Sequence, residues 1–140
     1  MPSAGGGRAV ARKYVLDTHT YIFMLTAPRR LGREARKAIE RVEAGRAEAW
    51  VPAAVVAETL ILRDLGRVAV GLGELRRALD GAPGLHFLPL DLAQLEEFAA
   101  LASIRDPFDR LVLGAARKLG AALLTRDTHL HEIGLVETIW

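Results

Sequence analysis

Two aspartates stand just past short apolar runs that have the composition of buried strands. Asp17 follows the run Tyr14-Val15-Leu16, and Asp127 ends the segment AALLTRD at residues 121–127. In an open α/β sheet, ligands bind outside the carboxyl ends of the strands, so both carboxylates are placed for metal binding or catalysis. A helix cap or a turn also favours aspartate at such positions, and this alternative stays open for both.

Two further acids interrupt the apolar faces of predicted helices. Glu58 lies in the predicted helix 53–65, and Asp109 lies in the predicted helix 107–119. Their neighbours one and two turns away are apolar: Val55, Ile61, Leu62 and Leu65 for Glu58, and Val112, Leu113 and Ala116 for Asp109. A charge on an apolar face is costly unless it is paired or metal-bound. The alternatives are a glutamate at the edge of the face paired with an arginine, and an aspartate favoured by the helix dipole.

The neighbours of these acids divide into structural and chemical candidates. Asp106 precedes Pro107, which suits the first position of a helix, so Asp106 is well explained as the cap of that helix. Thr18 and Thr125 are placed to hydrogen-bond a carboxylate or a phosphate oxygen, and a cap or turn role explains them equally well.

The segments that must position the acids alternate between strands and helices. A first helix, capped by Thr18 or Thr20, is predicted to run through residue 25, and further helices are predicted at 31–42, 53–65, 72–79, 92–101 and 107–119. Strands are predicted at 13–16, 50–51, 87–90 and 121–125, with a last strand within 133–140. The proline inside 87–90 makes that strand an edge or irregular one. This alternation predicts an α/β fold, with a central and mostly parallel sheet flanked by helices.

Four acids at one edge of such a sheet would repel one another and raise each other's pKa. A hard divalent cation removes that conflict. Because all the candidate ligands are oxygen atoms, they select Mg²⁺ or Mn²⁺ rather than zinc.

The composition limits the classes of protein to consider. The 140 residues are 51% hydrophobic and 26% charged, which predicts one globular domain at 13–140 after a flexible N-terminus at 1–12. There are no cysteines, so disulfides and cysteine catalysis are excluded. The net charge of +2 is compatible with a nucleic-acid partner. No apolar run has the ~20 residues of a membrane span, so no membrane association is expected.

Four motifs resemble those of the PIN-domain nucleases, and especially the VapC-type toxins of bacterial toxin–antitoxin pairs. They are LDTH at 16–19, VAET at 56–59, DPFDRL at 106–111 and LTRD at 124–127. The resemblance implies that Asp17, Glu58 and Asp109 hold the principal Mg²⁺ or Mn²⁺ ion. Asp127 would complete the site or help to hold a second ion. These four acids would then be the catalytic residues of a PIN-like domain.

The activity implied by the resemblance is that of a metal-dependent endoribonuclease, which hydrolyses RNA phosphodiester bonds. Such a toxin would act in the cytoplasm as a homodimer and be silenced by a cognate VapB-like antitoxin. Two alternatives stay open: a PIN-like binding module without catalysis, and another Mg²⁺-dependent enzyme that processes phosphates.

Basic and histidine residues near the motifs are weaker candidates. Arg110 and Arg126 flank the acids and either contact phosphates or are ordinary surface or ion-pair arginines. His19 is expected to be an accessory to Asp17, and no metal site is assigned to His129 or His131. The basic cluster in residues 29–37 either helps to hold RNA or is a solvated helix face; it comprises Arg29, Arg30, Arg33, Arg36 and Lys37.

Overall fold

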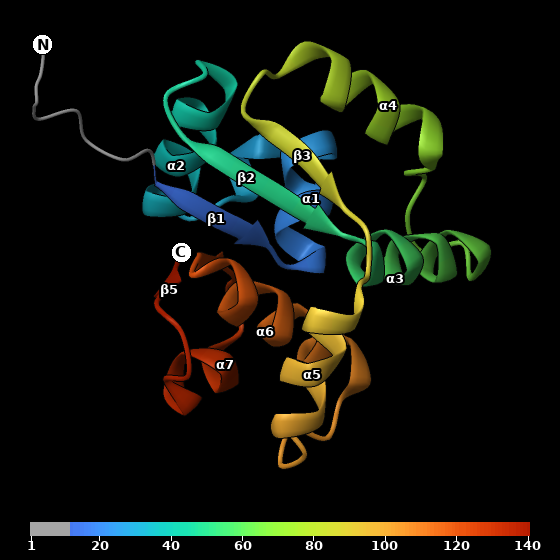
Figure 1. The fold of residues 1–140 in the computed structure, drawn as a ribbon. Coiled ribbons are helices and arrows are strands. Elements are labelled where there is room, and N and C mark those ends of the chain that lie inside the picture. Colours follow the sequence, from blue (N-terminus) through green and yellow to red (C-terminus); the bar gives the residue numbers. More distant parts are fainter. Residues whose placement is uncertain (1–11) are drawn as a thin grey trace, which may run out of the picture.

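The computed structural model describes residues 12–140, which form a five-stranded sheet whose strands are all parallel (Figure 1). The strand order is β3-β2-β1-β4-β5. The strands are β1 (Lys13–Leu16), β2 (Glu48–Pro52), β3 (Leu85–Leu88), β4 (Ala122–Leu124) and β5 (Thr138–Ile139). The predicted α/β class with a mostly parallel sheet is therefore confirmed. Apolar residues fill the central strands, as expected where both faces of a sheet are covered.

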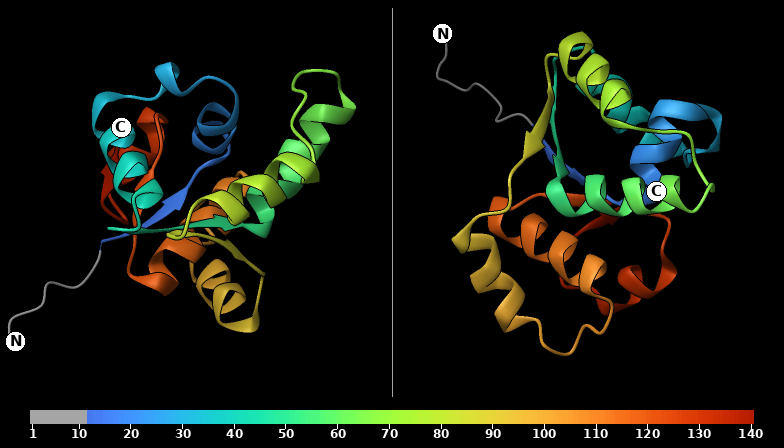
Figure 2. Two further views of the ribbon diagram at one scale, coloured as in Figure 1. Left: turned by 90° about the horizontal axis from the view of Figure 1, so that it is seen from above. Right: turned by 90° about the vertical axis from the view of Figure 1, so that its right-hand side faces the viewer.

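Helices cover both faces of the sheet (Figures 1 and 2). One face carries α1 (Thr18–Thr26), α2 (Arg33–Glu43) and α4 (Leu72–Gly81). The other carries α5 (Leu92–Ala100) and α6 (Pro107–Leu119), which pack against each other. The helix α3 (Ala53–Asp64) contacts both α1 and α6, and so joins the two layers. A 3₁₀ turn, η1 (Pro28–Arg30), follows α1, and a short helix, α7 (Thr128–Ile133), follows β4.

The helices that matter for the site begin and end where their sequences indicate. Asp17 caps α1 and Asp106 caps α6, each through a carboxylate oxygen that accepts a backbone N–H. Pro107 occupies the first turn of α6, where its missing N–H costs nothing. Gly120 ends α6 with φ +62°, a left-handed conformation that glycine adopts without strain.

Several predicted boundaries differ from the structure. The strand expected at 87–90 is β3 at Leu85–Leu88, because Pro89 has no N–H with which to extend the ladder. Its predicted place at an edge of the sheet is confirmed. The strand expected at 50–51 is longer, Glu48–Pro52. The helix expected from residue 31 begins at Arg33, because the unpredicted turn η1 holds Leu31 in extended backbone.

The predicted flexible N-terminus lies outside the described residues, except for Arg12. The Arg12 guanidinium pairs with Glu137 at 3.1 Å and lies over the Tyr14 ring. Within residues 12–140, none of the helices combines the length and the apolar character that a membrane span needs.

Candidate active site

The carboxyl ends of β1 and β4 bring Asp17 and Asp127 to the same edge of the sheet. The two strands pair in parallel, with Leu16 opposite Leu124, so the residues that follow them emerge side by side. A backbone hydrogen bond of 3.1 Å from the Asp17 N–H to the Leu124 carbonyl fixes this exit. The helices α3 and α6, which carry Glu58 and Asp109, contact each other, and α3 also contacts α1.

Two buried threonines hold the acids in place. The Thr125 hydroxyl donates to Asp17 Oδ2 at 2.6 Å, while Asp17 Oδ1 accepts the Thr18 N–H at 2.8 Å. The Thr18 hydroxyl donates to Glu58 Oε1 and thereby links α1 to α3. Thr125 is 0% exposed and Thr18 is 2% exposed, so both hydrogen bonds lie beneath the surface of the site.

Asp109 has the most perturbed carboxyl group of the site. Its pKa is raised from 3.8 to about 7, first by burial and then by the negative charges of Asp106, Asp17, Asp127 and Glu58. The four predicted ligands and the cap of α6 therefore share one electrostatic environment. A carboxyl group with such a pKa exchanges its proton near neutral pH, which is the range useful for acid–base chemistry.

The two remaining acids also serve as helix caps. Asp106 accepts the Asp109 N–H at 3.0 Å, as predicted for a cap. Asp127 caps α7 by accepting the N–H groups of His129 and Leu130, and its own N–H donates to the Thr125 hydroxyl at 3.1 Å. The cap role that the sequence left open for Asp127 is thus present, and its negative charge also contributes to the raised pKa of Asp109.

The apolar face that singled out Glu58 is only partly buried. Val55 is fully buried, but Ile61 is 47% exposed and Leu65 is 62% exposed. That part of the sequence argument was wrong, although Glu58 does lie among the other acids. For Asp109 the same argument is confirmed, because its neighbours Val112, Leu113 and Ala116 are all at most 1% exposed.

The donor atoms of the four acids are of the type that a hard cation prefers, but their arrangement in the structure is not that of a metal site. All four predicted ligands offer only carboxylate oxygens, which suit Mg²⁺ or Mn²⁺. Over residues 12–140, however, no three His, Cys, Asp or Glu side chains are arranged to hold a metal ion. The repulsion that raises the pKa of Asp109 is the feature that a cation would relieve. In the chemistry of their donor atoms, these residues therefore fit a divalent cation.

Sequence reasoning missed a buttress behind Thr125. The His131 Nε2 atom lies 2.8 Å from the Thr125 carbonyl oxygen, and its Nδ1 atom lies 2.6 Å from the Thr138 hydroxyl. Both ring nitrogens are thus engaged by protein, which makes His131 a support of the loop that carries Asp127. No sequence pattern marks the contact between His131 and Thr138, because it joins α7 to β5 through side chains alone.

The two arginines that flank the acids have different surroundings. The Arg110 guanidinium lies 3.8 Å from the centre of the Phe98 ring and donates to the Phe98 carbonyl at 2.7 Å. Arg110 is therefore engaged with α5, which favours the alternative that it is an ordinary arginine rather than a phosphate ligand. Arg126 instead lies over the Phe23 ring, at 5.0 Å from its centre.

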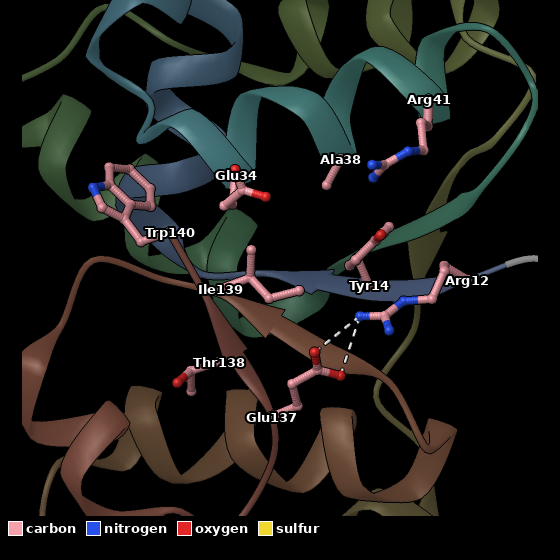
Figure 3. A pocket seen from close by; sticks show the side chains of 9 residues that line it. All are labelled: Arg12, Tyr14, Glu34, Ala38, Arg41, Glu137, Thr138, Ile139 and Trp140. Carbon is pink, nitrogen blue, oxygen red and sulfur yellow. Dashed lines mark hydrogen bonds and ion pairs between the residues drawn. The ribbon is translucent and has the colours of Figure 1, made fainter.

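A cavity of about 480 Å³ lies between α2 and β5, apart from the acids (Figure 3). Its wall includes the Arg12–Glu137 ion pair, Tyr14 and Trp140, but none of the predicted catalytic acids. Its only acids, Glu34 and Glu137, are paired with Lys37 and Arg12, so the cavity offers no comparable cluster of carboxylates.

Comparison with known protein families shows the family to which the chain belongs. The family model described as "PIN domain" matches residues 14–135, which is most of the chain. The chain belongs to the PIN-domain family. The family predicted from the sequence motifs is therefore confirmed. No match was found among curated proteins.

Solved structures with the same PIN-domain fold include toxin–antitoxin proteins at low sequence identity. VapBC2 from Rickettsia felis, bound to promoter DNA, has a TM-score of 0.67 at 14% identity, covering 91% of this chain and 97% of that chain. DNA-bound VapBC from Salmonella typhimurium has a TM-score of 0.63 at 18% identity, with coverages of 91% and 97%. VapC20 from Mycobacterium tuberculosis, a toxin that cleaves the sarcin–ricin loop, has a TM-score of 0.55 at 16% identity, with coverages of 89% and 97%.

Proposed function

We propose that this PIN-domain protein is a VapC-type toxin, an endoribonuclease that needs Mg²⁺ or Mn²⁺. The observation that carries the proposal is the gathering of the acids at the carboxyl edge of the sheet, where Thr125 bonds to both Asp17 and Asp127 and Thr18 bonds to Glu58. The charges of these acids add to burial in raising the pKa of Asp109. A structural cap would need one carboxylate at each helix, not a cluster. The similarity to an RNA-cleaving VapC20 supports RNA as the substrate.

In this proposal each acid has a defined task. Asp17, Glu58 and Asp109 hold the principal cation, and Asp127 completes the site or contributes to a second one. When bound, the cation supplies charge neutralisation at the phosphate and lowers the pKa of its water. Thr125 and Thr18 keep Asp17 and Glu58 oriented through their hydroxyl groups. Asp109 is half-protonated near pH 7 and must lose that proton to act as a ligand or as a base.

We further propose a VapB-like antitoxin as partner, supported by the similarity to the VapBC structures from Rickettsia felis and Salmonella typhimurium. The surface that suits such a partner is an apolar groove of about 470 Å³ between α3, α4 and β3. Its wall includes Leu60, Leu72, Leu75 and Phe87, and Leu72 and Phe87 are 45% and 40% exposed. Exposed apolar patches of this kind mark protein-binding sites. A homodimer and a cytoplasmic location belong to the same proposal.

The enzymatic proposal is tested by incubating purified protein with single-stranded RNA and Mg²⁺ or Mn²⁺, with and without EDTA. Asp17→Asn and Asp109→Asn remove predicted ligands with little change of shape. Asp91→Asn is the matched control, because Asp91 caps α5 in the same way and does not belong to the acid cluster. We expect cleavage by the wild type and by the control, and none with EDTA or with either ligand variant. Cleavage that persists in EDTA would refute the metal-nuclease mechanism.

The second candidate is a PIN-like binding module without catalysis. It is favoured by one observation, that the acids of residues 12–140 are not already arranged as a metal site. The two candidates differ in the response to cations. A nuclease site should gain thermal stability from Mn²⁺ through Asp17 and Asp109, whereas a binding module should show neither this gain nor RNA cleavage.

A further inference from the structure

An aromatic ring with two guanidinium groups lies next to the acid cluster. The Phe23 ring belongs to α1 and is 4% exposed. The Arg30 guanidinium carbon lies 4.3 Å from the centre of this ring, and that of Arg126 lies 5.0 Å from it. Arg30 ends η1, whereas Arg126 lies between β4 and α7, so segments far apart in the sequence converge here. We call Phe23, Arg30 and Arg126 the Phe23 platform.

The two guanidinium groups of the platform have no anionic partner in the part of the chain that the structure describes. Each is exposed, and neither has a carboxylate oxygen within ion-pair distance. Arg12, Arg77 and Arg117 do pair with glutamates. The ring that Arg30 and Arg126 share sets them apart from the other arginines without a carboxylate partner, such as Arg46 and Arg67. Stacking on Phe23 holds both cations in defined positions but leaves their charges uncompensated. A bound anion would supply that compensation.

The platform is linked to the acid cluster through residues that neighbour the acids in sequence. Arg126 stands between Thr125, whose hydroxyl holds Asp17, and Asp127. His19, two residues after Asp17, is exposed and places its ring 6.1 Å from that of Phe23. Trp140 approaches the same ring from the end of the described chain, with the ring centres 6.4 Å apart. Aromatic rings interleaved with arginines are the pattern with which proteins bind single-stranded nucleic acid.

We propose that the Phe23 platform binds the RNA phosphate that flanks the cleaved one, with Arg30 and Arg126 as its ligands. The proposal rests on the proposed ribonuclease function. A polyanion that approaches five clustered acids is repelled, and cations fixed beside them offset this repulsion and set the direction of the strand. The exposed ring of His19 favours a nucleic acid over an acidic protein segment, because a neighbouring base can stack on it.

The test measures RNA binding by fluorescence anisotropy from 50 to 200 mM KCl, in the Asp17→Asn background so that no cleavage occurs. The variant carries Arg30→Gln and Arg126→Gln. The control carries Arg46→Gln and Arg67→Gln, which remove the same charge from exposed positions outside the site. For single strands, each phosphate contact contributes about 0.7 to the slope of log Kd against log [salt]. We therefore expect the platform variant to lose about 0.7 to 1.4 of this slope, and to bind about 5- to 25-fold more weakly at 0.1 M KCl.

Steady-state cleavage by the otherwise wild-type enzyme provides the second readout. We expect the platform variant to raise KM with little change in kcat, and the control to change neither. If the wild type cleaves RNA but the platform variant has the same salt slope and the same KM as the control, the proposal that the platform binds RNA is refuted. The proposed ribonuclease function is then retained. If the wild type neither cleaves nor binds RNA, both proposals fail together. If the variant keeps its RNA affinity but escapes inhibition by the antitoxin, the platform serves the antitoxin, and our assignment to RNA is wrong.

Discussion

Replacing Asp109 by asparagine should stabilise the protein in the absence of a cation, which is unusual for a change in a candidate active site. The folded state holds the Asp109 proton up to about pH 7, whereas an unfolded aspartate loses it near 3.8. Between these pH values the folded state binds more protons than the unfolded state, so wild-type stability falls as the pH rises. The neutral amide of Asp109→Asn avoids this loss.

The size of the effect follows from the pKa shift and from the exposure of the group. Each pKa unit corresponds to about 1.4 kcal/mol, so a shift of roughly three units would be worth about 4 kcal/mol in a fully buried site. Asp109 is half-buried, and solvent screening reduces the gain to about 2 kcal/mol. For a domain of this size, that gain raises Tm by roughly 6–8 °C.

The assay is urea unfolding in EDTA at pH 8.0 and at pH 4.0, with Asp91→Asn as the control cap variant. We expect Asp109→Asn to exceed the wild type by about 2 kcal/mol at pH 8.0 and to match it at pH 4.0. Adding Mn²⁺ at pH 8.0 should reverse the order, because a ligand that binds only the folded state stabilises by RT ln(1 + [L]/Kd) and the variant lacks one of its carboxylates. A variant that is less stable than the wild type at pH 8.0 in EDTA would refute the reasoning.

Three other changes test the support of the site, the packing of the last residue and the partner surface. Thr125→Val removes a buried hydroxyl that bonds both Asp17 and Asp127, so urea unfolding should show a loss of about 1–3 kcal/mol, and unchanged stability would contradict the supporting role of this hydroxyl. Gly32→Ala would place a Cβ atom 2.4 Å from the Trp140 carbonyl carbon and should cost about 1–3 kcal/mol by the same measurement. Gly81→Ala, which meets no atom within 4 Å, is its control and should not destabilise the fold through a clash. Leu72→Glu in the apolar groove should leave RNA cleavage intact and weaken inhibition by the antitoxin in a titration; equal inhibition would remove the groove from the interface.

Asp17 and Asp127 could be found from the sequence because buried strands leave a clear signal and parallel strands end at a common edge. Asp109 could be found because the apolar residues around it are buried as predicted. Glu58 was chosen partly for a wrong reason, since Ile61 and Leu65 are exposed to solvent. Amphipathic periodicity cannot distinguish a face that packs inside the domain from one left open for a partner.

Other features depend on contacts between side chains distant in the sequence. His131 contacts Thr125 and Thr138, and the Phe23 ring lies under Arg30 and Arg126. No local sequence spacing predicts these contacts. Strand ends were also misplaced around Pro89, where the hydrogen-bond ladder rather than hydropathy sets the limit. Sequence patterns thus located the acids but not the groups that orient them.

The position of β1 between β2 and β4 also bears on when the acid cluster is completed during synthesis of the chain. Asp17 leaves the ribosome early, but its hydrogen-bond partner Thr125 and its neighbour Asp127 are made near the end of the chain. Such pairing between distant segments forms late in folding. A chain interrupted before β4 lacks one of the acids and the hydroxyl that orients another. For a toxin, this order of assembly would keep unfinished chains harmless until almost the whole sequence has been translated.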